Sequence, residues 1–92
     1  MSKELEYFRH VIDHLDEELI NTLSRRMKVI PQVAMCKKEN GIPRCHPKRE
    51  RGIISAARVL AKSKDLNPDL VEAIMKLIIA EAHRIEKEII GE

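Results

Sequence analysis

Apolar residues follow a helical period over most of the first 39 residues. They recur every three or four positions, which is the spacing of one helix face, and they are Phe8, Ile12, Leu15, Leu19, Leu23, Met27, Ile30 and Ala34. Ser2 can cap the start of such a helix, and Asn40-Gly41 offers the left-handed residue that ends one. At about 55 Å the helix would be longer than a compact domain of this size. We therefore expect its apolar face to be buried, in part against another copy of the chain.

Pro31 lies inside this predicted helix. Proline removes a backbone hydrogen bond and clashes with the carbonyl four residues earlier, here that of Met27. The apolar period nevertheless continues through Val33 and Ala34 without a polar loop. The pattern favours a kinked helix over a break into two helices.

Two further amphipathic helices are predicted, at about residues 47–64 and 68–90. In each case a possible cap precedes a proline at the first helical position, with His-Pro at 46–47 and Asn-Pro at 67–68. The expected buried face of the earlier helix is Ile53, Ile54, Ala57, Leu60 and Ala61. That of the later helix is Leu70, Ile74, Leu77, Ile78, Ala82, Ile85 and Ile89. The chain is thus predicted to be all-α, a single domain with a three-helix protomer and a very long first helix.

Composition supports helices packed through aliphatic side chains. Hydrophobic residues make up 43% of the 92 residues, but aromatic residues only 2%. A chain this short buries a limited fraction of its surface on its own, and this favours an oligomer. The two cysteines, Cys36 and Cys45, are too few for a disulfide framework and are expected to be reduced thiols without a function.

Charge and hydropathy exclude several classes of partner. The formal net charge is only +2, with both signs mixed along the chain and one basic cluster at residues 37–51. Nucleic-acid binding is not expected, because it usually requires a concentrated basic face and often stacking aromatics. No apolar run approaches the ~20 residues that span a bilayer, and the polar start is unlike a signal peptide, so we expect no membrane association and a cytoplasmic location.

Three cations border the apolar stripe of the long helix: Arg9, Arg26 and Lys37. Each alone is explained by an ion pair or by a side chain that reaches solvent. Arg26 and Lys37, however, are eleven positions apart, which places them on the same side of a helix about 16 Å apart, where they could hold opposite ends of a small anion. Arg9 is roughly 25 Å from Arg26 along the axis, so it could join that site only from a second copy of the chain.

One set of residues follows a specific order and spacing along essentially the whole chain. It is Arg9-x2-Ile12-Asp13-x-Leu15-Asp16-x2-Leu19-Ile20-x2-Leu23-x2-Arg26, then Lys37, Gly41-Ile42-Pro43 and Lys48-Arg49-Glu50-Arg51. This pattern resembles that of the all-helical chorismate mutase family. The last helix places Glu86 where the family has Gln or Glu. The resemblance implies an intertwined homodimer with two equivalent active sites, and conversion of chorismate to prephenate in aromatic amino acid biosynthesis. It implies no metal and no cofactor.

The resemblance also assigns roles to individual residues. Arg26, together with Arg9 of the other protomer, would bind the two carboxylates of the substrate, and Arg49 would assist. Such a clamp would favour the compact, reactive conformer that this intramolecular rearrangement needs.

The remaining roles concern the ether oxygen and the ring hydroxyl. Lys37 and Glu86 would flank the ether oxygen, where charge builds as the C–O bond breaks, and Glu50 would accept a hydrogen bond from the hydroxyl. An ionised Glu86 would repel the ether oxygen, whereas a protonated one would donate to it. We therefore expect activity to fall as pH rises through the ionisation of Glu86, and Glu86→Gln to flatten the profile.

Two positions that would contact substrate differ from the common family pattern. His46 stands where an Asp often lies beside the substrate hydroxyl, and Ala82 replaces a small hydroxyl residue that can touch a carboxylate. These differences leave related reactions open, namely a mutase acting on 4-amino-4-deoxychorismate or a lyase that eliminates pyruvate from isochorismate.

Other histidines give weaker signals. His10 and His14 are one turn apart and Cys45-His46 could add ligands, but no further ligand has suitable spacing, so a metal site is not expected. His83 is expected at the surface. A rival function of another class is a non-catalytic helical dimerisation module, whose cations would pair with acidic side chains across a coiled seam.

Overall fold

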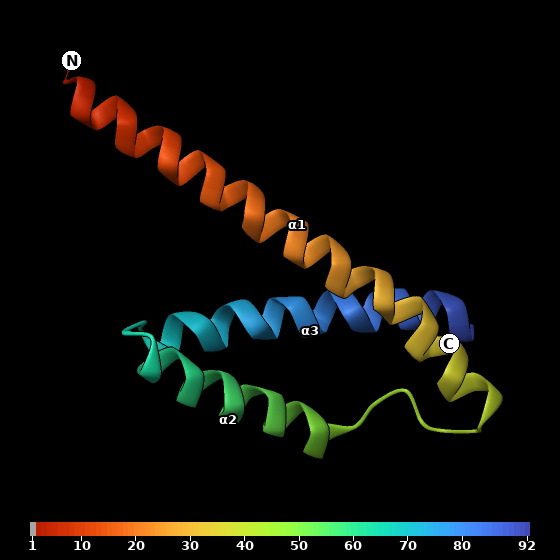
Figure 1. Cartoon of the computed structure of the whole chain (residues 1–92). Helices are drawn as coiled ribbons and strands as arrows, with labels where there is room; N and C mark the ends of the chain where they lie inside the picture. Colours follow the sequence, from red (N-terminus) through yellow and green to blue (C-terminus); the bar gives the residue numbers. More distant parts are fainter. Residues whose placement is uncertain (1) are drawn as a thin grey trace.

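Three helices make up the secondary structure of residues 2–92. The computed structural model describes residues 2–92, with α1 at Lys3–Glu39, α2 at Pro47–Ser63 and α3 at Pro68–Ile90 (Figure 1). The all-α prediction with a very long first helix is confirmed, and the predicted helix ends agree within one residue.

Local hydrogen bonds explain where α1 begins and ends. The hydroxyl of Ser2 accepts from the backbone N–H groups of Glu4 and Leu5, at 3.1 and 3.2 Å. At the other end Gly41 adopts a positive φ of 63°, the left-handed conformation that glycine tolerates best. Both predicted signals therefore act as expected.

The starts of α2 and α3 differ. The side chain of Asn67 accepts from the backbone N–H of Asp69 at 2.9 Å, which confirms it as a cap. His46 occupies the capping position of α2, but its side chain makes no capping hydrogen bond. The expectation that its side chain caps the helix is wrong, and the imidazole turns to the cavity described below.

Pro31 does not interrupt α1. The helix is continuous from Lys3 to Glu39 with the proline inside it. The alternative of two helices separated at Pro31 is wrong, and the continuous apolar period was the better indicator.

The helices make an elongated molecule with α3 in the middle. Both α1 and α2 pack on α3, and Figure 1 shows α1 crossing α3 near its own C-terminal end while its N-terminal part projects away from both other helices. The radius of gyration is 17.0 Å, whereas a compact chain of this size would have about 13 Å. The long axis measures 58 Å, close to the length expected for α1.

Most of the predicted apolar stripe on α1 is exposed in the single chain. Ala34 is fully buried, but residues before the crossing with α3 are not, and these are Phe8, Ile12, Leu15, Leu19 and Leu23. Nothing in one chain extends far enough to cover this half of the helix, so its burial against another copy stays a prediction. A contiguous apolar face of this kind is unusual for a monomer.

The other two predicted faces are also only partly covered. Ala61 on α2 and Ala82 on α3 are buried, whereas Leu60, Leu70, Ile74 and Leu77 are exposed. Among residues 2–92 no helix is both long and apolar enough to cross a bilayer.

Candidate active site

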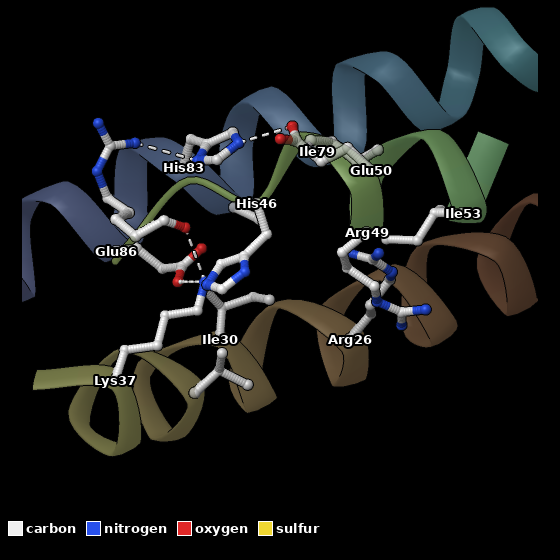
Figure 2. A pocket seen from close by; sticks show the side chains of 13 residues that line it. Arg26, Ile30, Lys37, His46, Arg49, Glu50, Ile53, Ile79, His83 and Glu86 are labelled. Carbon is white, nitrogen blue, oxygen red and sulfur yellow. Dashed lines mark hydrogen bonds and ion pairs between the residues drawn. The ribbon is translucent and has the colours of Figure 1, made fainter. Parts of the chain in front are cut away.

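A cavity of about 440 Å³ lies where the C-terminal half of α1, the loop before α2, the start of α2 and the second half of α3 meet (Figure 2). All of the residues that the sequence singled out, apart from Arg9, line it, and they are Arg26, Lys37, His46, Arg49, Glu50, Ala82 and Glu86. Its volume is in the usual range for a small-molecule site.

Lys37 of α1 and Glu86 of α3 form an ion pair at one end of the cavity. The Nζ atom of Lys37 donates to Oε1 of Glu86 at 2.7 Å and to the backbone oxygen of Arg44 at 2.9 Å. Only 6% of the Glu86 side chain and 18% of the Lys37 side chain are exposed. A lysine ammonium has three N–H donors, so one donor of Lys37 is left for a molecule in the cavity.

Two arginines lie toward the other end of the cavity. Figure 2 shows the side chains of Arg26, from α1, and Arg49, from α2, close together and apart from the Lys37–Glu86 pair. Neither forms an ion pair with another described residue, and Nη1 of Arg26 is buried without a hydrogen-bond partner among them. A buried donor of this kind is costly unless something accepts from it. A carboxylate fits, because guanidinium groups bind carboxylates with two parallel hydrogen bonds.

His46 and Ala82 complete two walls of the cavity. The Nε2 atom of His46 is buried and has no hydrogen-bond partner among the described residues, so it too can interact with a bound molecule. Ala82 is 8% exposed and offers only a methyl group. At these two positions the cavity therefore presents an imidazole nitrogen and an apolar contact.

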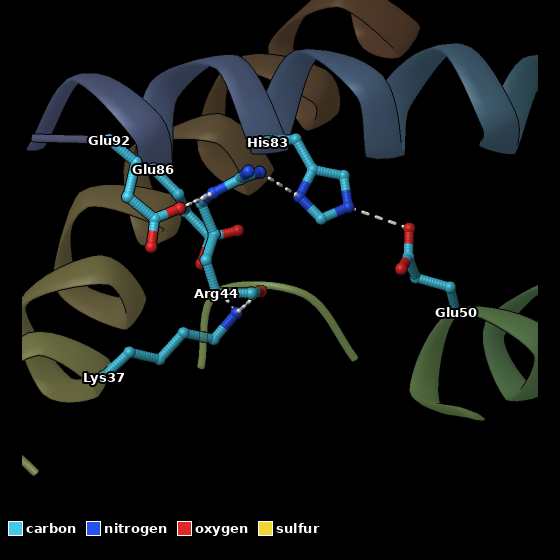
Figure 3. Close-up of polar contacts among 6 residues, drawn as sticks. All are labelled: Lys37, Arg44, Glu50, His83, Glu86 and Glu92. Atoms are coloured by element: carbon cyan, nitrogen blue, oxygen red, sulfur yellow. Dashed lines mark hydrogen bonds and ion pairs between the residues drawn. The ribbon is translucent and has the colours of Figure 1, made fainter. Parts of the chain in front are cut away.

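Glu50 is held by residues that the sequence analysis did not assign to the site. Its Oε1 atom is 2.8 Å from Nε2 of His83, and Nδ1 of His83 is 3.1 Å from Nη1 of Arg44 (Figure 3). His83 and Arg44 both line the cavity. The expectation that His83 lies at the surface is wrong, since the ring is half-buried between α3, the start of α2 and the loop. His83 lies three residues before Glu86 and therefore on the same helix face. This spacing could have predicted that His83 lines the cavity.

Arg44 is itself fixed by a carboxylate. Its Nε atom donates to Oε2 of Glu92 at 2.8 Å. This hydrogen bond raises the pKa of Arg44, with smaller opposing and supporting effects from burial and from nearby charges. The guanidinium is therefore a permanent cation in the wall of the cavity, balanced by Glu92.

Arg9 is not part of this cavity in the single chain. It lies on the projecting N-terminal part of α1 and is exposed, whereas the cavity begins at Arg26. One chain therefore brings together all of the predicted site residues except the one that was expected from a second copy.

Comparison with known proteins places these residues in a family context. The family described as chorismate mutase type II matches residues 8–87. The chain is 26% identical over 92 residues to the chorismate mutase of Methanocaldococcus jannaschii, covering all of this chain and 93% of that protein. It is 31% identical over 84 residues to the T-protein of Haemophilus influenzae, covering 91% of this chain and 22% of that protein.

A third similar protein is the bifunctional chorismate mutase/prephenate dehydratase of Buchnera aphidicola from Schizaphis graminum. The identity is 26% over 84 residues, covering 91% of this chain and 22% of that protein. The chain thus spans under a quarter of the length of the T-protein and of the bifunctional enzyme, but nearly all of the Methanocaldococcus protein.

Proposed function

This chain belongs to the chorismate mutase type II family, a family of isomerases, and from that premise we propose that it converts chorismate to prephenate. The observation that carries the proposal is the cavity itself. It holds two arginines without carboxylate partners at one end and a lysine with a spare donor at the other. This arrangement suits a small molecule with a carboxylate at one end and an ether oxygen toward the other.

The reaction explains why such a cavity is sufficient. In chorismate the ether C–O bond breaks while a C–C bond forms within the same molecule, so no atom or electron is gained or lost. The step needs no nucleophile, and we propose no cofactor and no metal for it. What it needs is a compact conformer and stabilisation of the charge that develops on the ether oxygen.

We assign the roles from the positions of the side chains. Arg26 binds a substrate carboxylate through its unpaired guanidinium, and Arg49 beside it assists. The free donor of Lys37 meets the ether oxygen, and Glu86 lies on the flank of the same atom.

Glu50, His46 and Ala82 belong to the part of the cavity that receives the ring and the remaining substrate groups. Glu50 accepts from the ring hydroxyl through Oε2, since His83 engages Oε1. His46 presents its buried Nε2 atom beside that substituent. Ala82 contacts substrate but cannot hydrogen bond to a carboxylate.

We further propose that the active enzyme is an intertwined homodimer in which Arg9 of a second copy binds the other carboxylate. The exposed apolar face of α1 supports this, because packing against an equivalent helix would remove it from water. The projection of α1 beyond α3 supports it too, since the Arg9 end of the helix can then reach another protomer. We propose a cytoplasmic location and neither nucleic-acid nor membrane partners.

The rival function, a non-catalytic dimerisation module, required acidic partners for both Arg26 and Lys37. Lys37 has such a partner in Glu86, but Nη1 of Arg26 has none among the described residues. In a dimerisation module an acidic side chain of another copy would have to reach Arg26 at the cavity, whereas a carboxylate of a small molecule in the cavity supplies the acceptor directly, so the enzyme is the better explanation.

The direct experiment is to add purified protein to chorismate and follow the loss of its absorbance, then determine the mass of the product. A mutase gives a product with the mass of the substrate, whereas a lyase releases pyruvate. The same assay with isochorismate and with 4-amino-4-deoxychorismate tests the related reactions. Lys37→Met should lower the rate roughly a hundredfold or more, and Lys38→Met, an exposed neighbour, is the matched control. No turnover of chorismate by the purified protein would contradict the proposal.

A further inference from the structure

Arg44 and His83 form a hydrogen-bonded connection between the two ends of the cavity, and the rearrangement as described above uses neither of them. Arg44 contacts Lys37 through its backbone oxygen at 2.9 Å and His83 through its guanidinium at 3.1 Å. His83 contacts Glu50 at 2.8 Å (Figure 3). One loop residue therefore touches the lysine at one end and, through a histidine on α3, the carboxylate on α2.

The partners of His83 define which of its nitrogens carries the proton. A guanidinium can only donate, so Nδ1 of His83 must accept from Nη1 of Arg44 and cannot carry a hydrogen. The ring is then neutral with its hydrogen on Nε2, and Nε2 donates to Oε1 of Glu50. A protonated ring would place an N–H at Nδ1 against the N–H of Arg44, which this geometry does not permit.

Arg44 is well suited to impose that tautomer because it cannot easily move or lose its charge. Its Nε atom is bonded to Glu92 at 2.8 Å, and this contact raises the pKa of the guanidinium. Its backbone is bonded to Lys37. Both attachments hold Nη1 at Nδ1 of His83.

We propose that His83 is a positioning residue for the recognition of the ring hydroxyl. As the Nε2–H tautomer imposed by Arg44, it holds Oε1 of Glu50 and thereby directs Oε2 into the cavity as a hydrogen-bond acceptor. This inference rests on the proposed chorismate mutase function. It adds a specificity: the ring substituent must donate a hydrogen bond, because a carboxylate held in this way accepts and cannot donate.

Kinetics of two His83 variants separate this role from a merely structural one. His83→Leu keeps bulk but has no donor, and its kcat/KM should fall about tenfold, the loss expected for one hydrogen bond to a charged group. Most of that loss should be in KM, because the hydroxyl is bound alike in the ground state and the transition state. His83→Gln carries an amide N–H that can reach Glu50 and should stay within about threefold of the unsubstituted protein.

Arg84→Gln is the matched control for these variants. It changes the neighbouring residue on α3, whose ion pairs with Glu81 and Glu88 are exposed and outside the cavity, and it should leave both kinetic constants unchanged. Equal losses in His83→Leu and His83→Gln would overturn the proposal, because bulk or helix stability would then be the cause.

Two further measurements test the connection itself. In a Glu50→Ala background His83→Leu should have little additional effect on kcat/KM, whereas full additivity would show that His83 does not act through Glu50.

Nitrogen NMR of the histidine rings at alkaline pH should show His83 in the Nε2–H tautomer. A ring with its hydrogen on Nδ1, or a charged ring, would overturn the proposal. This NMR readout needs no activity, so failure of the proposed function in the chorismate assay remains distinguishable from failure of this inference.

Discussion

The Nζ atom of Lys37 lies 2.7 Å from Oε1 of Glu86, although 49 positions separate the two residues in the sequence. The contact joins the C-terminal end of α1 to α3 and is almost fully shielded from water. It places the carboxyl group of Glu86 beside the ammonium that we assign to the ether oxygen, so both side chains lie next to the same proposed substrate atom.

The role of Glu86 at the ether oxygen is tested by replacing its carboxyl group. Glu86→Gln supplies a permanent neutral donor of similar shape, and the dependence of kcat on pH should be weaker than in the unsubstituted protein, as the family resemblance predicts. The measurement is the rate of chorismate loss across a pH series for both proteins. Profiles of identical shape would contradict the assigned role of Glu86.

Removal of the lysine should also destabilise the fold. Lys37→Met leaves the buried carboxylate of Glu86 without its counter-charge, and breaking a buried pair in this way costs roughly 3 kcal/mol. Lys38→Met changes an exposed neighbour and should cost less than about 0.5 kcal/mol. Urea unfolding at a fixed protein concentration and neutral pH measures both values. Equal losses in the two variants would show that the pair contributes nothing to stability.

The helices could be predicted from the sequence because their signals are local. The period of the apolar residues, the Ser2 and Asn67 caps and the glycine after Asn40 each act within a few residues of where they stand. The sequence could not show what covers an apolar face, so it did not distinguish Ala34, which is buried against α3, from Leu19, which is exposed in one chain. Burial depends on the arrangement of helices, and for α1 it depends on the proposed second copy.

The candidate site was predictable where its residues share a helix. Arg26 and Lys37 are placed on one side of α1 by their spacing alone, and family resemblance added Glu50 and Glu86. The contacts of His83 with Glu50 and Arg44 could not be predicted in this way. They depend on the path of the loop at residues 40–46, which no periodic pattern describes.

An ion-pair cluster between α2 and α3, outside the cavity, predicts how stability responds to acid. Arg58 of α2 donates to Asp69 and Glu72 of α3, and Glu72 also pairs with Lys76. The hydrogen bond from Lys76, and then the charges of Lys76 and Arg58, lower the pKa of Glu72, with burial opposing them. A carboxyl whose pKa is lower in the folded state stabilises the fold above its ordinary pKa, and this contribution is lost as pH falls through the folded value.

Glu72→Gln should accordingly lower the urea midpoint at neutral pH, and the difference from the unsubstituted protein should disappear in acid, below the folded pKa of Glu72. Urea unfolding from neutral pH into acid measures this. Glu39→Gln removes an exposed carboxylate that forms no ion pair with another described residue and serves as the control. A difference that is constant across this range would contradict a role for the ionised carboxylate.

The strongest test of the proposed dimer uses two inactive proteins. Arg9→Ala should abolish most activity because each site loses the arginine supplied by the other copy. Arg26→Met should do the same within its own chain. It should leave the fold intact, since Nη1 of Arg26 has no partner among the described residues that would be left unpaired. Each variant alone then has two defective sites per dimer.

When the two variants are unfolded together and refolded as a mixture, heterodimers form. In a heterodimer one site carries both substitutions, but the other combines an intact Arg9 with an intact Arg26. With random pairing, half of the dimers are mixed and half of their sites are intact, so activity should return to roughly a quarter of the unsubstituted level. If Arg9 acted within its own chain, no mixture could restore a site, because every chain would still carry one defect. Recovery on mixing therefore requires a site shared between two copies.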